Sequence, residues 1–236
     1  LEYIIDYYGD DIHPGDVILH NDVFTGSNQH ADVGVYKPVF RGGNLVGWTA
    51  AKGHVADIGG QTIGGYDPTI TEVWQEALRI PPIKVYERGQ LRRDVWELIF
   101  ANIRLPLVAE DIRAAIGACT VGERRLLSTI DEVGQETFEA HMDYVVASTE
   151  ALLRAEINAF PDGTYGATAW VADGGALGAH GRHKIVVNVK IEGDSITFDF
   201  TGSDPQTAGY VNMPPAAVRG SVLLALLMIT TDMPHN

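Results

Sequence analysis

The hydrophobic pattern changes its period near residue 91, and this change limits the folds that the chain can adopt. Before it, short apolar runs bounded by glycine and proline, such as Val17–His20 and Ile83–Tyr86, predict strands. After it, apolar residues recur every three to four positions, which is typical of helices. A chain with this change of period is predicted to be an α+β protein with mixed or antiparallel sheets and a helical middle section.

Three regions are expected along the chain. Residues 1–90 form a strand-rich region, residues 91–160 a helical region, and residues 161–236 a β-hairpin region that leads into an apolar helix. The helical region should contain two long helices, at about 108–133 and 136–160, in a bundle-like arrangement.

Turn residues divide these regions further. Arg41–Asn44 predicts a hairpin turn between two strands, and Pro161–Tyr165 predicts a turn after the last long helix. Residues 185–191 and 196–200 should form the second hairpin. The N-terminal residues resemble the interior of an element, and both ends of the chain are interpreted as cuts in a longer protein.

Composition excludes several functional classes. The 236 residues carry a net charge of −14, which argues against binding to nucleic acid or to an anionic membrane. The apolar run Val222–Ile229 is too short to span a bilayer. Cys119, the single cysteine, lies among apolar and small residues and is predicted to be a buried structural thiol. Because no signal peptide is visible and no internal disulfide can form, a cytoplasmic location is expected.

Histidine and aspartate occur together at three places in the first 60 residues, which predicts a metal site. These are His20 with Asp22, His30 with Asp32, and His54 with Asp57. His20 and His54 each end a predicted strand, and imidazole with carboxylate suits a divalent ion such as Mn, Zn or Fe.

Each of these residues also has a plainer interpretation. Asp22 either orients a ligand histidine or forms an Asx turn, and His20 is a ligand or a polar residue at a strand end. His54 and Asp57 share a face only if their segment is a helical turn. His180 and His183 are interpreted as residues of a flexible, glycine-rich loop.

ATP chemistry is not visible in this sequence. The glycine-rich stretches contain no phosphate-binding loop, and no Gly-x-Ser-x-Gly nucleophile motif occurs. Any ATP would therefore have to bind elsewhere.

The order of the motifs resembles the hydantoinase B/oxoprolinase family, which includes the corresponding subunits of acetone and acetophenone carboxylases. The most specific motif is Gly53-His54-Val55-Ala56-Asp57-Ile58-Gly59-Gly60. The resemblance extends over nearly the whole chain and is also carried by the following segments: Pro14–Asp22, Arg79–Lys84, Pro161–Tyr165, Asp199–Ser203 and Val211–Asn212.

This resemblance implies a metal-binding subunit that works with a hydantoinase A-like, ATP-binding partner. The family's ligand element is commonly His-x-x-Asp followed by the histidine of the glycine-rich motif, which corresponds here to Asp32 and His54. The position three before Asp32 is Gln29, so His30 is taken as a ligand with a shifted spacing. Asp57 is expected to be a further ligand or a supporting group, and the chain to be an internal portion of a larger subunit.

The expected reaction is ATP-dependent hydrolysis of a cyclic amide, such as a hydantoin or 5-oxoproline. Carboxylation of a ketone is the second hypothesis, and a non-catalytic interface piece of such a complex is the third. In the first two, His54, Asp57 and Asp22 serve catalysis, and His30, Asp32, His54 and Asp57 hold the metal.

Overall fold

The computed structural model describes residues 1–172, 181–209 and 211–230. Its contacts divide the chain into two compact units, and each unit is described by itself. The first consists of Leu1–Glu132 with Met213–Ala217, and the second of Val133–Asn212 with Val218–Asn236.

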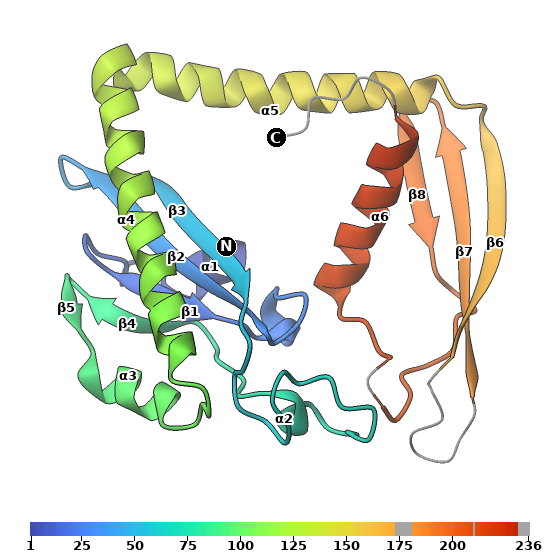
Figure 1. Cartoon of the computed structure of the whole chain (residues 1–236). Coiled ribbons are helices and arrows are strands. Elements are labelled where there is room, and N and C mark those ends of the chain that lie inside the picture. The colour runs from blue at the N-terminus through green and yellow to red at the C-terminus, as the bar shows by residue number, and fades with distance from the viewer. Residues whose placement is uncertain (173–180, 210, 231–236) are drawn as a thin grey trace. The chain divides into compact units, whose positions relative to one another are not determined.

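The first unit is built on an antiparallel sheet of five strands in the order β3-β2-β1-β4-β5 (Figure 1). The strands are β1 (Val17–His20), β2 (Asp32–Arg41), β3 (Asn44–His54), β4 (Ile83–Glu87) and β5 (Gln90–Leu91). The helices are α1 (Glu2–Tyr8), η1 (Val23–Thr25), α2 (Val73–Glu76), α3 (Arg93–Phe100) and α4 (Leu107–Val133). The predicted hairpin at Arg41–Asn44 is confirmed. The helical region expected from residue 91 begins only at Arg93, because Leu91 pairs with Tyr86 in β5.

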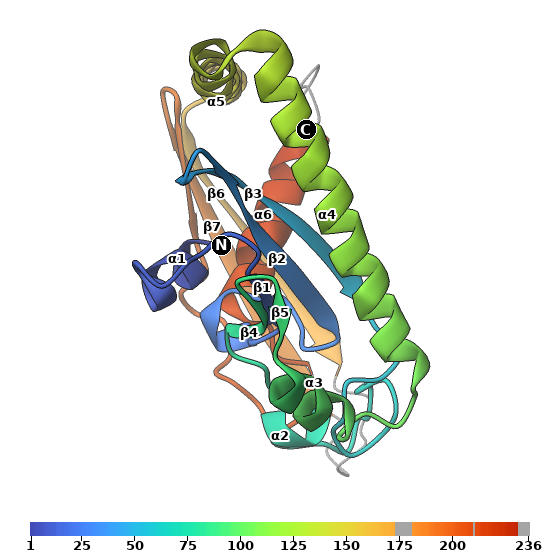
Figure 2. The ribbon, with the colours of Figure 1, turned by 90° about the vertical axis from the view of Figure 1, so that its left-hand side faces the viewer.

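Helix α4 runs along one face of this sheet and closes the core (Figure 2). Val108, Ile112 and Cys119 of α4 are buried in one cluster with strand residues that include Leu19 and Val35. Cys119 is 2% exposed, and its thiol faces the carbonyl of Val35, so the predicted structural role is confirmed. Since α4 uses its apolar stripe to cover a sheet, it does not form the expected helical bundle.

The hairpin of β2 and β3 contains a one-residue irregularity that matters for the site. Phe40 pairs with Leu45, but Val39 pairs with Gly47, so Val46 is an extra residue on β3. All later pairs are shifted by one position, and the last of them places Asp32 opposite His54. Residues directly opposite each other in an antiparallel pair project to the same face of the sheet.

The second unit contains an antiparallel sheet of three strands in the order β6-β7-β8, together with two helices. Its elements are α5 (Gln135–Asn158), β6 (Gly163–Ala172), β7 (Arg182–Glu192), β8 (Ser195–Asp199) and α6 (Pro215–Ile229). The predicted turn at Pro161–Tyr165 is shorter than expected, because the chain enters β6 at Gly163. His183 is not a loop residue, since it pairs with Val171 inside the sheet, and His180 lies outside the described residues.

The helices of the described ranges differ from membrane-spanning helices in length and apolar character. Within residues 1–172, 181–209 and 211–230, none combines the length and the apolar character needed to cross a membrane. The apolar helix α6 has 15 residues.

Candidate active site at the ends of β2 and β3

Asp32 and His54 form the centre of the candidate site. Asp32 begins β2 and His54 ends β3, and the pairing of the two strands brings their side chains together. The Nδ1 atom of His54 lies 2.9 Å from Oδ1 of Asp32. The Asp32 side chain is 15% exposed and that of His54 is 45% exposed, so the pair can be reached from solvent.

Gln29 is the third member of this group. Its Nε2 donates to Oδ1 of Asp32 at 2.8 Å and lies 3.1 Å from Nδ1 of His54. The amide nitrogen, the carboxylate oxygen and the imidazole nitrogen therefore lie at the corners of a nearly equilateral triangle. Sequence reasoning placed His30 here, although the distance of three residues from Asp32 pointed to position 29.

Donors surround the carboxylate of Asp32. Burial by itself raises the pKa of Asp32, but hydrogen bonds from Asn28, Gln29 and His54 outweigh it and leave the pKa below its ordinary value. Because its pKa is lowered, Asp32 is an ionised acceptor at neutral pH. Lys52 donates to the side chain of Asn28, and burial lowers the pKa of Lys52.

Tyr66 closes one side of the group. Its ring stacks on the imidazole of His54 with centroids 5.8 Å apart, and its hydroxyl donates to Oε1 of Gln29 at 2.7 Å. The segment before it turns sharply at Gly60 and Gly65, which have positive φ angles and pack against the carbonyl of Glu76. A Cβ at Gly60 would overlap that carbonyl, so only glycine fits there.

His30 does not join the triangle. Its side chain is 2% exposed, and Nδ1 lies 3.1 Å from Oε2 of Glu76 on α2. Its Nε2 is buried and has no hydrogen-bond partner among the described residues. The imidazole thus connects the loop before β2 to α2 beneath the surface.

Asp57 is also directed elsewhere. It is fully buried, and its Oδ2 accepts from the backbone N–H of Arg104 at 2.6 Å. The guanidinium of Arg104 lies 3.3 Å from Oδ1 and donates to the carbonyl of Gly60 at 2.5 Å. In this arrangement Asp57 anchors the glycine-rich segment to the end of α3.

Asp22 and His20 lie at the end of β1. Asp22 is 1% exposed, caps η1 by accepting from the N–H of Phe24, and forms an ion pair with Arg79 at 2.9 Å. Burial raises the pKa of Asp22, but the hydrogen bonds from Arg79 and Phe24 lower this pKa by more than burial raises it. The carboxylate of Asp22 therefore stays ionised at neutral pH. Burial lowers the pKa of His20 to about 4, which leaves its imidazole neutral.

Asn21 was not singled out from the sequence, yet it joins three segments of the site region. It is fully buried, donates to the carbonyls of His30 and Leu78 at 2.8 and 3.0 Å, and accepts from the N–H of Ile80 at 2.7 Å. This one amide therefore fixes the loop before β2 relative to the segment after α2. No pattern in the sequence distinguishes Asn21 from an ordinary turn residue.

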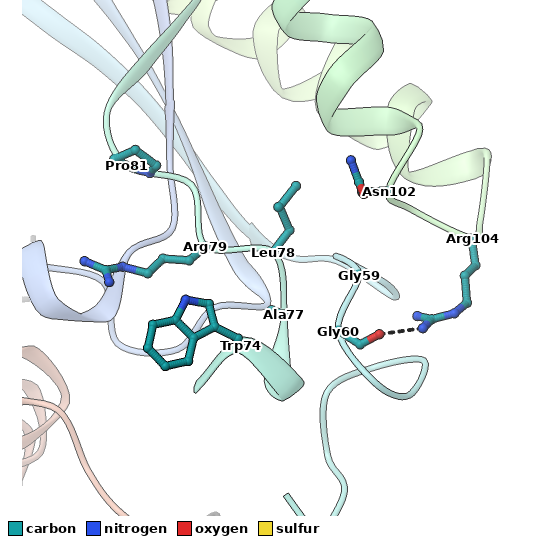
Figure 3. A pocket seen from close by; sticks show the side chains of 9 residues that line it. All are labelled: Gly59, Gly60, Trp74, Ala77, Leu78, Arg79, Pro81, Asn102 and Arg104. Atoms are coloured by element: carbon teal, nitrogen blue, oxygen red, sulfur yellow. Dashed lines mark hydrogen bonds between the residues drawn. The ribbon is translucent and has the colours of Figure 1, made fainter. Parts of the chain in front are cut away.

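A cavity of about 650 Å³ lies beside these ion pairs (Figure 3). Its walls include the exposed indole of Trp74, the side chain of Arg79 and that of Arg104. It is a volume that suits a small organic ligand, but neither Asp32 nor His54 lines it.

The predicted metal would need several donor side chains that converge on one point. Among the residues that the structure describes, no group of three or more His, Cys, Asp and Glu side chains could hold an ion. Asp32 and His54 offer a carboxylate oxygen and an imidazole nitrogen side by side at a half-exposed position, the donor types that Mn, Zn and Fe accept. These two residues supply two of the donors that such an ion would need, whereas His30 and Asp57 have other partners.

The comparison with known proteins decides the family. The family model described as hydantoinase B/oxoprolinase matches residues 1–236. The chain belongs to this family. The expectation drawn from the glycine-rich motif is thereby confirmed.

The relatives include lactam-acting and carboxylating enzymes. The beta subunit of the caprolactamase of Pseudomonas jessenii is 37% identical over 100% of this chain, and the B-type subunit of a putative D-/L-hydantoinase of Pseudomonas sp. is 34% identical over 95%. The acetophenone carboxylase delta subunit of Aromatoleum aromaticum is 29% identical over 92%. The crystal structure of ATP-dependent caprolactamase from Pseudomonas jessenii superposes on 99% of this chain with a TM-score of 0.90.

The matched proteins are much longer than this chain. It covers 40% of the caprolactamase subunit, 38% of the hydantoinase subunit and 32% of the carboxylase subunit. In the caprolactamase crystal structure it covers 40% of the matched chain.

Proposed function

We propose that this chain is part of the B-type subunit of an ATP-dependent enzyme that hydrolyses a cyclic amide. The observation that carries the proposal is the match to ATP-dependent caprolactamase, with 37% identity and a TM-score of 0.90 over 99% of the chain. ATP is assigned to a hydantoinase A-like partner subunit, and this sequence contains no phosphate-binding loop of its own.

Asp32 and His54 are the residues that we assign to the chemistry. Ring opening of a lactam needs an activated water and a polarised carbonyl, and both need charge that is held in place. Asp32 supplies a carboxylate that stays ionised at neutral pH, and the contact of 2.9 Å orients the imidazole of His54. Nδ1 of His54 and Oδ1 of Asp32 face each other, so these two atoms share either a proton or a cation.

A divalent ion of Mn, Zn or Fe is the group that we assign to this pair. When bound, such an ion polarises a carbonyl and lowers the pKa of a coordinated water. The residues around the pair have supporting roles. Asp57 with Arg104 holds the glycine-rich segment, and Asp22 with Arg79 holds the end of β1.

The reaction is tested with the full-length subunit assembled with its hydantoinase A-like partner. ATP is supplied with caprolactam, hydantoin or 5-oxoproline, and ring opening is followed by the appearance of the free amino or carbamoyl acid. We expect ring opening that requires ATP with at least one of these lactams.

The same preparation distinguishes lactam hydrolysis from ketone carboxylation. The 29% identity with the acetophenone carboxylase subunit favours ketone carboxylation as the second candidate. ATP consumption that requires bicarbonate together with acetone or acetophenone, without lactam hydrolysis, would establish the carboxylase instead. No turnover in either arm would favour a non-catalytic interface role.

A further inference from the structure

Gly34 lies inside β2, and the ring of Tyr36 explains why glycine is needed there. An added Cβ at Gly34 would lie 2.6 Å from Cε2 and 2.8 Å from the hydroxyl oxygen of Tyr36. Such distances are repulsive between non-bonded atoms, so no larger residue fits unless the ring moves. A glycine inside a strand often marks the close approach of another group. The phenol of Tyr36 therefore occupies the space that a side chain at position 34 would fill.

The ring of Tyr36 lies on the face of the sheet that carries the candidate site. Val33 and Val35 belong to the core that α4 covers, and side chains alternate between the two faces along a strand. Asp32, Gly34 and Tyr36 therefore project to the opposite face. Because the hydroxyl lies at the level of Gly34, the side chain of Tyr36 runs along the strand toward Asp32.

The hydroxyl is one row of side chains away from the candidate site. Gly34 is paired with His20 on one side and with Lys52 on the other, so these three residues form one row across β1, β2 and β3. Asp32 and His54 form the next row on the same face. Residues two positions apart on a strand are separated by about 6.7 Å. A small cyclic molecule held at Asp32 and His54 therefore reaches the hydroxyl above Gly34.

The hydroxyl of Tyr36 is available to a ligand. Within the part of the chain that the structure describes, no residue forms a hydrogen bond with it. The side chain is half-buried, and burial raises the pKa of Tyr36, so the phenol keeps its proton at neutral pH. Tyrosine hydroxyls usually find a hydrogen-bond partner when they are buried. This phenol is therefore free to donate to an oxygen atom of a bound ligand.

We propose that Tyr36 is a further catalytic residue, whose hydroxyl donates a hydrogen bond to the carbonyl oxygen of the lactam bound at Asp32 and His54. This inference rests on the proposed function. When water adds to the carbonyl carbon, an electron pair of the C=O bond moves to the oxygen, and the phenol stabilises this charge without losing its proton. The ammonium group of Lys52, in the same row, favours negative charge at this place. Gly34 is a positioning residue, because it makes room for the ring.

Tyr36→Phe in the full-length subunit, assembled with its partner, tests the hydroxyl. The variant keeps the ring and removes the donor, so we expect kcat for lactam ring opening to fall by about 100-fold. KM should change little, because the negative charge develops only in the transition state. The control is Tyr8→Phe, which removes a hydroxyl that donates to the carbonyl of Pro82 at 3.1 Å. It should leave kcat unchanged.

Gly34→Ala tests the positioning role in the same assay. The added methyl group displaces the ring, so we expect kcat to fall about as far as in Tyr36→Phe. When Gly34→Ala is combined with Tyr36→Phe, kcat should fall little further, because no hydroxyl is left to displace. Gly117→Ala, on α4 with no atom within 4 Å of the added group, is the control and should keep full activity.

The outcomes separate this inference from the proposed function. A wild-type complex that opens the lactam ring, with Tyr36→Phe as fast as wild type, would overturn the inference alone. An equal loss from Gly34→Ala in the presence and absence of the Tyr36 hydroxyl would also overturn it, since the loss would then be structural. A wild-type complex that opens none of caprolactam, hydantoin and 5-oxoproline would refute the proposed function and this inference together.

Discussion

Asp32 and His54 are 22 residues apart in sequence, and their side chains are in contact because the pairing of the hairpin skips Val46. If Val46 paired with Val39 instead, the pairing that begins at Phe40 and Leu45 would place Asp32 opposite Gly53. His54 would then project to the other face of the sheet. The bulge at Val46 therefore determines whether the two functional groups meet.

Insertion of one alanine between Gly47 and Trp48 tests this relationship. We expect this insertion to abolish metal binding and activity, because it moves His54 one position further along β3 and places Gly53 opposite Asp32. Val46→Ala keeps the register and serves as the control, with activity close to that of the unmodified subunit. Circular dichroism would check that both proteins are folded. An insertion variant that binds metal normally would show that the register of β3 does not set the site.

Replacement of Asp57 separates a structural role from a role in metal binding. Asp57 is fully buried and accepts from the backbone N–H of Arg104 at 2.6 Å, so Asp57→Ala removes this hydrogen bond and leaves the N–H without its acceptor. We expect a loss of about 1–3 kcal/mol in the free energy of unfolding. The folded fraction should keep its metal content, as measured by elemental analysis. A stable Asp57→Ala subunit without metal would instead make Asp57 a ligand.

The ion pair of Lys84 and Asp16 predicts a large effect far from the chemistry. Lys84 is 5% exposed and Asp16 fully buried, and Nζ lies 3.0 Å from Oδ2. Lys84→Ala leaves a buried carboxylate without its cation, which should cost about 3–5 kcal/mol of stability. Lys190→Ala breaks the exposed pair with Glu192 and should cost at most about 1 kcal/mol. Equal shifts in denaturant midpoint for the two variants would contradict this.

His20 should make the first unit sensitive to mild acid. Burial lowers its pKa from 6.5 to about 4, so the unfolded chain binds a proton between these values and the folded chain does not. The stability contributed by neutral His20 is complete above pH 6.5 and is lost as the pH falls toward 4. The slope is at most about 1.4 kcal/mol per pH unit. His20→Gln should have a flatter dependence of melting temperature on pH, and parallel curves would exclude this role.

The sequence predicts most strands and helices because their signals are local. The alternating and helical patterns locate β1, β4, α4 and α5 to within a few residues. The partner of α4 could not be predicted, since an amphipathic stripe covers a sheet as readily as it joins a helical bundle. Strand β6 was missed because the turn signal at Pro161 and Gly163 masked it.

The candidate site was predictable only in part, because only some of its signals are local in the sequence. The pairing of histidine with aspartate, together with the resemblance to the family, singled out Asp32 and His54 as candidates, but the directions of the side chains depend on tertiary contacts. His30 turns inward because Glu76 of α2 lies behind it, and Gln29 turns outward to Asp32. The partner of Asp57, Arg104, is 47 residues away, and no spacing rule connects them.

The most direct test of the account is the rate of ATP-dependent lactam ring opening by His54→Ala in the assembled complex. We predict a fall of about 100-fold or more, with normal assembly with the partner subunit and a normal melting temperature, because the imidazole is part of the reacting site rather than of the core. Asp32→Asn should behave in the same way. A His54→Ala complex that opens the lactam ring at the unmodified rate would contradict the assignment of the site.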